Sequence, residues 1–410
     1  MINFLKKNFV LVAAILLGAV LVVKVIAITL GMSNFGWPTL NYFIGYETGF
    51  GGRKLIGTLS HLFLPEHLSL SIIRSIIISA NIILILLLFL FYARVTKSTD
   101  RNIVALIILL YFASPFSLVE WFQSGCSVVF METYQLIIVT IWLLLYLKYS
   151  SNYWMYAVTA ITVIICCLIH HTFCCTLLPL MASLLVYDMF CSDKLIRTRF
   201  LLTGLICVAL GILLFFIWTH SEMNIPQDKL TEYIHNSTNI RIKDESTAIQ
   251  QLYYDSNFEN YANQRESLIQ LRYPEFAISI LLLSPMLLIL YFPLFHAISN
   301  SNMSVQKCRY LLIGIIMIIM PLPIFVVATD YTRWFVCSFF CLSSLDLVLI
   351  YKNDALVTEG FYKLKNFFKK RIWLLIILII YMLNLHNISF LGLKEAIEAW
   401  SLVSSSILNL

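Results

Sequence analysis

The chain has 410 residues, of which 60% are hydrophobic and 12% are charged, and its formal net charge is +6. An average soluble protein is roughly 45–50% apolar and about 25% charged. A water-soluble globule of this size has too little interior to bury so much apolar surface. The composition therefore excludes a soluble enzyme, a disordered chain and a nucleic-acid-binding domain. The apolar runs are continuous rather than alternating, so we expect an all-α polytopic membrane protein.

Apolar stretches of membrane-spanning length recur along the whole chain, and we interpret residues 1–410 as a single integral membrane domain. About 11 transmembrane helices are predicted, within a range of 10–12. They lie at roughly 9–30, 72–93, 102–119, 134–149, 154–171, 172–190, 200–219, 276–298, 310–328, 335–351 and 372–386. The large hydrophilic segment 220–275 is inserted between spans seven and eight. Helical stretches at 247–253 and 261–271 predict that it forms a small helical cap on the outer face.

The distribution of Lys and Arg predicts the orientation of these spans. With the N-terminus in the cytoplasm, 17 of the 28 Lys and Arg residues lie in inner segments and 5 in short outer segments. Short cytoplasmic loops carry such an excess of Lys and Arg, so we expect the N-terminus inside and the C-terminus outside.

The first outer segment, Gly45–Gly57, holds five glycines in thirteen residues together with charged side chains. Glycines allow the backbone to approach a ligand closely. Glu47 is a candidate general base, Arg53 has the planar fork that suits phosphate oxygens, and Lys54 is a further candidate ligand for a diphosphate. The alternative interpretation is a flexible connector with a salt-bridged pair.

Two further groups of ionisable residues are predicted on the same outer face. Asp330 and Arg333 are three residues apart and share a helix face, where Arg333 can hold a diphosphate and Asp330 can position it or accept a proton. An N-cap with an interfacial Arg explains them equally well. His170 and His171 lie at a span end, where one can act as a base or both can cap a helix C-terminus.

Glu120 and Glu132 flank an eleven-residue stretch between two predicted spans. Either carboxylate can serve as the base. The interpretation we favour is that they mark where the chain leaves the lipid. The sequence therefore leaves the base open among Glu47, Glu120, His170, His171 and Asp330. No cluster has metal-ligand spacing, so we expect no metal and no other cofactor.

The layout of the chain, with Gly-Phe-Gly-Gly-Arg53 in the first outer loop and Asp330-x-x-Arg333 at a span start, resembles the bacterial O-antigen and capsule repeat-unit polymerases (Wzy type). More distantly it resembles GT-C-type glycosyltransferases and O-antigen ligases. Many such polymerases have two large outer loops and twelve or more spans, whereas this chain has one such loop and eleven predicted spans.

The resemblance implies glycosyl transfer at the periplasmic face of the bacterial inner membrane. An undecaprenyl-diphosphate-linked oligosaccharide would be the donor, and a second lipid-linked repeat unit the acceptor. Membrane lipids and a protein that regulates chain length are the partners implied, and no nucleic acid is. The alternatives are a GT-C-type transferase that adds one sugar from a polyprenyl-phosphate donor, and a flippase for lipid-linked oligosaccharides.

Overall fold

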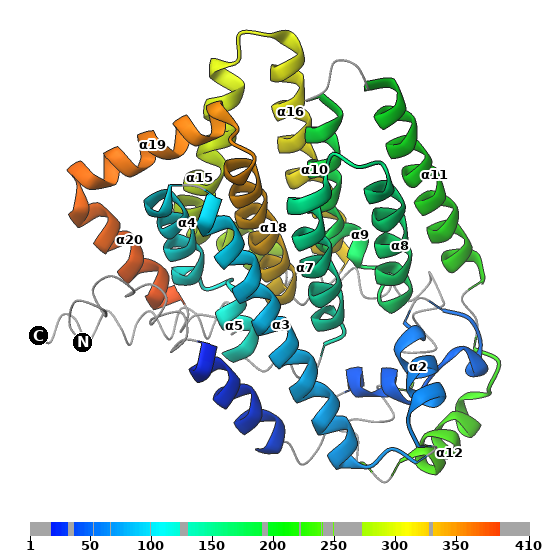
Figure 1. The fold of residues 1–410 in the computed structure, drawn as a ribbon. Coiled ribbons are helices and arrows are strands. Elements are labelled where there is room, and N and C mark those ends of the chain that lie inside the picture. Colours follow the sequence, from blue (N-terminus) through cyan, green and yellow to red (C-terminus); the bar gives the residue numbers. More distant parts are fainter. Residues whose placement is uncertain are drawn as a thin grey trace, which may run out of the picture. The chain divides into compact units, whose positions relative to one another are not determined.

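The computed structural model describes most of the chain as helices joined by short turns (Figure 1). The described residues are 18–31, 37–51, 53–65, 67–98, 100–123, 130–190, 196–220, 223–238, 240, 249, 273–327 and 331–385. These residues include no β-strand. The expected all-α fold is therefore confirmed for the part of the chain that the structure describes.

The helices follow one another along the chain with few long connections. After a first helix at Gly18–Gly31 come η1 (Trp37–Tyr42), η2 (Tyr46–Thr48), α2 (Leu55–Phe63), α3 (Leu70–Ser98), α4 (Arg101–Ala113), α5 (Leu118–Gln123), α7 (Glu132–Tyr149), α8 (Trp154–Ile169), α9 (Phe173–Thr176), α10 (Leu178–Phe190), α11 (Ile196–His220), α12 (Gln227–Ser237), α15 (Tyr273–Asn300), α16 (Ser304–Ile319), α17 (Leu322–Val327), α18 (Tyr331–Tyr351), α19 (Ala355–Lys370) and α20 (Ile372–Leu385).

Each predicted span overlaps helical structure in its described part. Five segments are long and apolar enough to cross a membrane. They are Leu70–Lys97, Thr198–Ile217, Ser279–Asn300, Ser304–Val326 and Arg333–Tyr351. Five further apolar helices are shorter, with 10–17 residues. The helices thus support a membrane-embedded protein, with five spans by length and composition among the described residues.

Prolines interrupt three of the predicted spans. The stretch 102–119 breaks after Ala113, where Ser114 adopts an extended conformation before Pro115. A residue that precedes proline is disfavoured in the helical region, so the helix stops there. A break also precedes Pro179, between α9 and α10, whereas Met320 keeps a helical conformation at the turn before Pro321, between α16 and α17. The predicted spans 102–119 and 172–190 therefore each consist of two helices, whereas Ser304–Val326 remains one of the five segments long and apolar enough to cross a membrane.

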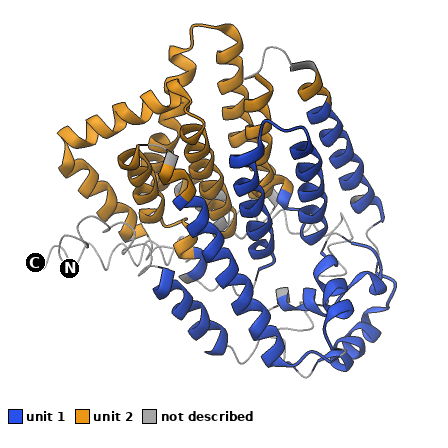
Figure 2. Cartoon of the chain, in the orientation of Figure 1, with its two compact units in different colours: residues 1–93, 121–173, 202–260 blue, residues 94–120, 174–201, 261–410 orange. Residues whose placement is uncertain are grey.

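The chain forms two compact units, each built from segments that are distant in the sequence (Figure 2). Unit 1 comprises residues 1–93, 121–173 and 202–260, and unit 2 comprises 94–120, 174–201 and 261–410. In unit 1, the antiparallel helices α7 and α8 pack together. In unit 2, α18 is the most buried of the five long apolar segments and contacts α4, α10, α15 and α19.

Ion pairs gather several helix ends of unit 2. Lys352, after α18, pairs with Asp188 at the end of α10. Arg309, near the start of α16, lies 3.4 Å from Asp354, which caps α19. Lys365 of α19 lies 3.2 Å from Asp100, the N-cap of α4. The first two pairs gather the ends of α10 and α18 with the starts of α16 and α19, and the third joins the start of α4 to a later turn of α19.

Candidate functional site

The site begins in unit 1 with a backbone that only glycine allows. A Cβ atom on Gly57, in α2, would lie 2.1 Å from the backbone oxygen of Ile44. A Cβ atom on Gly45 would lie 2.3 Å from Oε2 of Glu47 and 2.7 Å from the backbone nitrogen of Thr58. Contacts this short are sterically forbidden, so the two glycines allow α2 to pack directly against the segment that carries Glu47.

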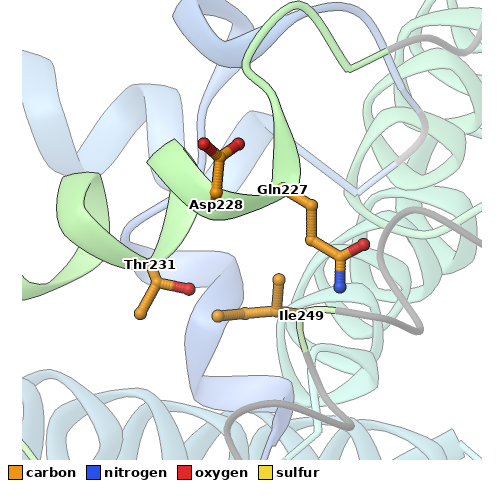
Figure 3. A pocket seen from close by; sticks show the side chains of 4 residues that line it. All are labelled: Gln227, Asp228, Thr231 and Ile249. Atoms are coloured by element: carbon orange, nitrogen blue, oxygen red, sulfur yellow. The ribbon is translucent and has the colours of Figure 1, made fainter.

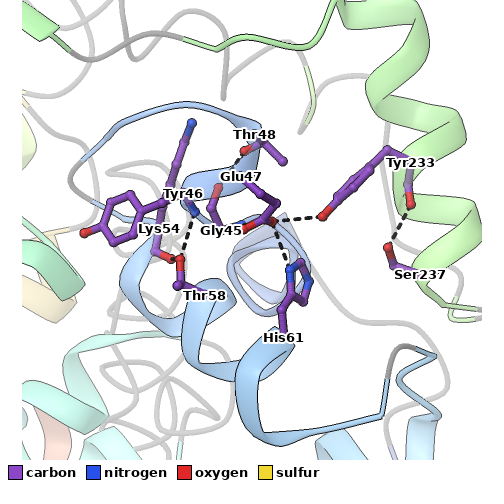
Figure 4. A network of polar contacts seen from close by, with 9 residues as sticks. All are labelled: Gly45, Tyr46, Glu47, Thr48, Lys54, Thr58, His61, Tyr233 and Ser237. Carbon is purple, nitrogen blue, oxygen red and sulfur yellow. Dashed lines mark hydrogen bonds and ion pairs between the residues drawn. The ribbon is translucent and has the colours of Figure 1, made fainter.

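The carboxylate of Glu47 is the centre of a polar network (Figure 4). Its Oε1 accepts hydrogen bonds from the backbone N–H of Gly45 at 2.8 Å and from the hydroxyl of Tyr233 at 2.9 Å. The Nδ1 atom of His61, one α2 turn beyond Gly57, lies 2.9 Å from the same oxygen. The Glu47 side chain is 40% exposed and that of His61 is 26% exposed, so solvent reaches both.

The contact with Glu47 defines the chemistry of the His61 ring. A nitrogen that faces a carboxylate carries the hydrogen, which leaves the lone pair of neutral imidazole on Nε2. This Nε2 has no hydrogen-bond partner among the described residues. A histidine oriented by a carboxylate, with its other nitrogen open to solvent, is the arrangement of a general base.

The network contains an ionised carboxylate, Glu47, and a charged ammonium, Lys54. Partial burial alone would raise the pKa of Glu47, but hydrogen bonds from its own backbone N–H, Tyr233 and Gly45, together with His61, lower that pKa. The Glu47 carboxyl therefore stays ionised at neutral pH. Burial lowers the pKa of Lys54 to about 8, against the attraction of Glu47. Because Lys54 is 8% exposed, it supplies a poorly hydrated ammonium that is still mostly charged at pH 7.

Helix α12, from the long segment 220–275, and the residues that flank it are hydrogen-bonded to the Glu47 segment and to Leu68. The backbone N–H of Asn224 donates to the Thr48 carbonyl at 2.8 Å. Leu68 receives a 2.7 Å hydrogen bond from the Thr238 hydroxyl, and its own N–H donates to Ser237 at 2.9 Å. Helix α12 thus delivers Tyr233 to Glu47, and the predicted helical cap on the outer face stays a prediction. The stretches predicted at 247–253 and 261–271 lie, apart from Ile249, outside the described residues.

A hollow lies on the other side of α12 (Figure 3). Gln227, Asp228, Thr231 and Ile249 line a volume of about 480 Å³ that is open to solvent. Thr231 and Tyr233 are two residues apart on the helix, roughly 200° around its axis, so the hollow and the Glu47 network occupy different faces. Three hydrogen-bonding side chains beside one branched apolar side chain suit a hydroxyl-rich ligand.

A second acid–histidine pair is buried in unit 1. Glu132 opens α7 and His170 follows α8, and their side chains are 0% and 4% exposed. The backbone N–H of Thr172 donates to Nδ1 of His170 at 3.2 Å, and the Thr172 hydroxyl lies 2.6 Å from that atom. Because Nδ1 is an acceptor, the neutral ring carries its hydrogen on Nε2, which lies 4.0 Å from Glu132 Oε1.

Gln135 and His171 complete the surroundings of this pair. The side-chain amide of Gln135 donates at 2.8 Å to the carbonyls of both Cys166 and His170, which anchors the end of α8 to α7. The rings of His170 and His171 lie 5.2 Å apart, and His171 is half-buried. Glu132, which the sequence places where the chain leaves the lipid, is fully buried beside His170, and its position at the membrane boundary stays a prediction.

An apolar cluster connects the two acid–histidine pairs within unit 1. Its buried members include residues adjacent to each pair or one helical turn away: Ile44, Ile56, Met131, Ile169, Leu230 and Ile234. Ile44 precedes the Glu47 segment, Met131 precedes Glu132, and Ile169 precedes His170. The first loop, α7, α8 and α12 therefore share one core, and this core positions both pairs.

The other predicted site residues divide between the two units. Arg53 lies in the turn before Lys54 and is half-buried. Glu120 and Arg333 belong to unit 2. Glu120 is 7% exposed, and Arg333 is 5% exposed with its guanidinium 3.9 Å from the centre of the Trp334 ring. Asp330 lies outside the described residues, so neither its predicted cap nor its predicted role is described.

Two residues of the network were not proposed as site residues from the sequence. His61 follows Gly57 by one helical turn, and this position is the sequence signal that identifies it. Tyr233 lies 186 residues from Glu47, and no local pattern reveals that contact.

Comparison of the chain with protein-family models, with curated proteins and with solved structures gave no match. Among the residues that the structure describes, no three His, Cys, Asp or Glu side chains gather in a way that would hold a metal ion. The functional argument therefore depends on the geometry of the site.

Proposed function

We propose that the chain is a polysaccharide polymerase, a glycosyltransferase that moves a glycan from undecaprenyl diphosphate to a second lipid-linked repeat unit. The observation that carries this proposal is the solvent-accessible Glu47–His61 pair with the Lys54 ammonium beside it. The pair offers a base for an acceptor hydroxyl, and the neighbouring cation suits a diphosphate leaving group.

In the proposed reaction, Nε2 of His61 removes the proton from an acceptor sugar hydroxyl. The oxygen forms a bond to the anomeric carbon of the donor glycan as the bond from that carbon to the diphosphate oxygen breaks. Undecaprenyl diphosphate leaves with the bonding electrons, and Lys54 and Arg53 stabilise its charge. Glu47 orients His61 and stabilises the imidazolium that forms, which afterwards loses its proton to solvent.

Two features outside the network support this choice of substrate. The hollow on α12 offers Gln227, Asp228 and Thr231 to sugar hydroxyls. Long apolar helices provide a membrane environment for a polyprenyl chain. A transferase that uses a lipid-linked donor needs both an apolar path for the lipid and a polar surface for the glycan.

We further propose that the protein spans the bacterial inner membrane about eleven times, with its N-terminus in the cytoplasm. The ion-paired helix ends of unit 2 carry Arg309, Lys352 and Lys365, which supports a shared cytoplasmic side for these ends. With this orientation, the Glu47 loop faces the periplasm, where lipid-linked repeat units are polymerised in the family that the sequence resembles.

Deletion of the gene in its source cell, followed by complementation, tests the proposal. The wild-type gene restores a ladder of polymer lengths, whereas His61→Ala and Arg53→Ala restore insertion but no ladder. His67→Ala is the matched control, because His67 is an exposed histidine nearby whose Nδ1 lies 3.4 Å from a backbone oxygen. Products extended by a single sugar would indicate a GT-C-type transferase instead. Normal ladders from both variants would refute the proposed site.

Arg333→Ala is tested separately in the same assay, because Arg333 belongs to unit 2. We expect loss of the ladder if Arg333 binds the diphosphate. An unchanged ladder would remove Arg333 from the proposed site and leave the Glu47–His61 proposal intact.

A further inference from the structure

The junction between α19 and α20 in unit 2 combines positive charge with a lipid-compatible surface. Helix α19 is amphipathic and buries Val357, Gly360, Phe361, Leu364 and Phe368. The segment 363–371, which covers the last eight residues of α19 and Arg371, carries five cations and no acidic residue. Helix α19 ends at Lys370, Arg371 has a non-helical conformation, and α20 begins at Ile372.

The cations at the junction differ from those earlier on the helix. Lys363 lies 3.1 Å from Glu359, and Lys365 lies 3.2 Å from Asp100, so these two are ion-paired. Lys369, Lys370 and Arg371 are exposed and have no ion-pair partner among the described residues. Three positive charges in consecutive positions are therefore available to an anion.

Helix α20 presents an apolar face next to these cations. Trp373, Ile376, Ile377, Ile380 and Leu383 are each 50–57% exposed. Their spacing of three and four residues places them along one side of the helix. The opposite side packs inward, where the Tyr381 hydroxyl donates to the Leu282 carbonyl at 2.7 Å. An aromatic ring at the start of an exposed apolar helix is typical of the membrane interface.

We propose that the α19–α20 junction binds an anionic phospholipid. Lys369, Lys370 and Arg371 contact the phosphate and the charged headgroup, and an acyl chain lies along the exposed face of α20. Charge complementarity selects an anionic over a zwitterionic headgroup, and the apolar face next to the cations selects a lipid over a soluble phosphate. This inference depends on the membrane character of the helices and is independent of the proposed transferase activity.

The test uses the full chain in nanodiscs of phosphatidylcholine alone or mixed with phosphatidylglycerol. Native mass spectrometry counts bound phosphatidylglycerol, and thermal unfolding reports stabilisation. Each cation near an anionic surface contributes about fivefold in affinity. Neutralisation of all three cations should therefore lower the preference for phosphatidylglycerol over phosphatidylcholine by roughly 100-fold. The variant K369Q/K370Q/R371Q should lose both the bound lipid and the rise in Tm, and the wild-type effect should weaken in high salt.

Three controls make the result specific. The variant R94Q/K97Q/R101Q removes equal charge from exposed positions in α3 and α4 and should keep the wild-type preference. The conservative variant K369R/K370R/R371K should keep it as well, which excludes misfolding as the cause of a loss. Soluble glycerol phosphate, added to phosphatidylcholine nanodiscs, should leave Tm unchanged.

Retention of the wild-type preference in K369Q/K370Q/R371Q would overturn the proposal, as would an equal loss in R94Q/K97Q/R101Q. Stabilisation by soluble glycerol phosphate that matches the effect of phosphatidylglycerol would also overturn it, because the site would then recognise a phosphate rather than a lipid.

Discussion

Gly57→Ala tests the packing that holds the candidate site together. A Cβ atom there would lie 2.1 Å from the Ile44 oxygen and 2.4 Å from its carbonyl carbon. Both are backbone atoms in the core of unit 1, so no flexible side chain can move aside. To reach an ordinary contact distance of 3.4 Å between the added Cβ atom and the Ile44 oxygen, α2 must move by about 1.3 Å relative to the Glu47 segment.

That displacement determines the expected effect on activity. His61 lies on the same helix as Gly57, and its 2.9 Å contact with Glu47 would lengthen beyond hydrogen-bond distance. Misplacement of a catalytic group by about 1 Å can lower the rate roughly 100-fold. Overpacking of this kind also costs about 1–3 kcal/mol of stability. We expect Gly57→Ala to lose roughly 100-fold in transferase rate and to unfold at a lower temperature.

The assay measures the transferase rate and the Tm of Gly57→Ala, with Gly211→Ala as the control variant. Gly211 lies in α11 with no atom within 4 Å of an added Cβ, so alanine there should leave the rate unchanged and stabilise the helix by up to about 1 kcal/mol. Wild-type rate and Tm in Gly57→Ala would refute the reasoning, because the α2 contact would then tolerate a methyl group.

Three further predictions concern charges. His61→Ala should lower kcat by about 10²–10⁴-fold. The double variant with Glu47→Gln should lower kcat little further, because Glu47 acts through His61. Additive losses of kcat in a double-mutant cycle would contradict this role of Glu47. The pKa of Lys54 is lowered to about 8, so its positive charge is lost as pH rises through that value. KM for the anionic donor should therefore rise above pH 8 in the wild type and stay flat in Lys54→Arg; equal pH profiles would remove Lys54 from the site. Asp346 of α18 is fully buried, and neither of its carboxyl oxygens has a hydrogen-bond partner among the described residues. Asp346→Asn should therefore leave Tm unchanged or raise it, and a large fall in Tm would reveal a partner.

The apolar pattern of the sequence predicts the helices well but misses those that are not uniformly apolar. Helix α19 lies between the predicted spans 335–351 and 372–386 and is not itself a predicted span, because its polar face lowers its mean hydropathy. Its apolar face is stabilised by tertiary packing, with Gly360 against Pro293 of α15. Hydropathy averaged over a window cannot detect such a helix, whereas a 3.6-residue period can.

The candidate site was predictable where its signal is local. The density of glycines in residues 45–57 identifies the loop that carries Glu47, and the structure explains Gly45 and Gly57 by close backbone contacts. The contact of Glu47 with Tyr233 depends on how α12 folds back onto this loop. The proximity of Glu132 and His170 depends on the pairing of α7 with α8. Neither contact has a local sequence signature.

The most direct test of the central claim is a reaction between two purified components. The deletion strain should accumulate the undecaprenyl-diphosphate-linked repeat unit, which can be extracted and incubated with the purified protein in lipid. The account predicts a ladder of lipid-linked oligomers from the wild type and from His67→Ala, and none from His61→Ala. Unchanged repeat units with the wild-type protein, or an identical ladder from His61→Ala, would contradict it.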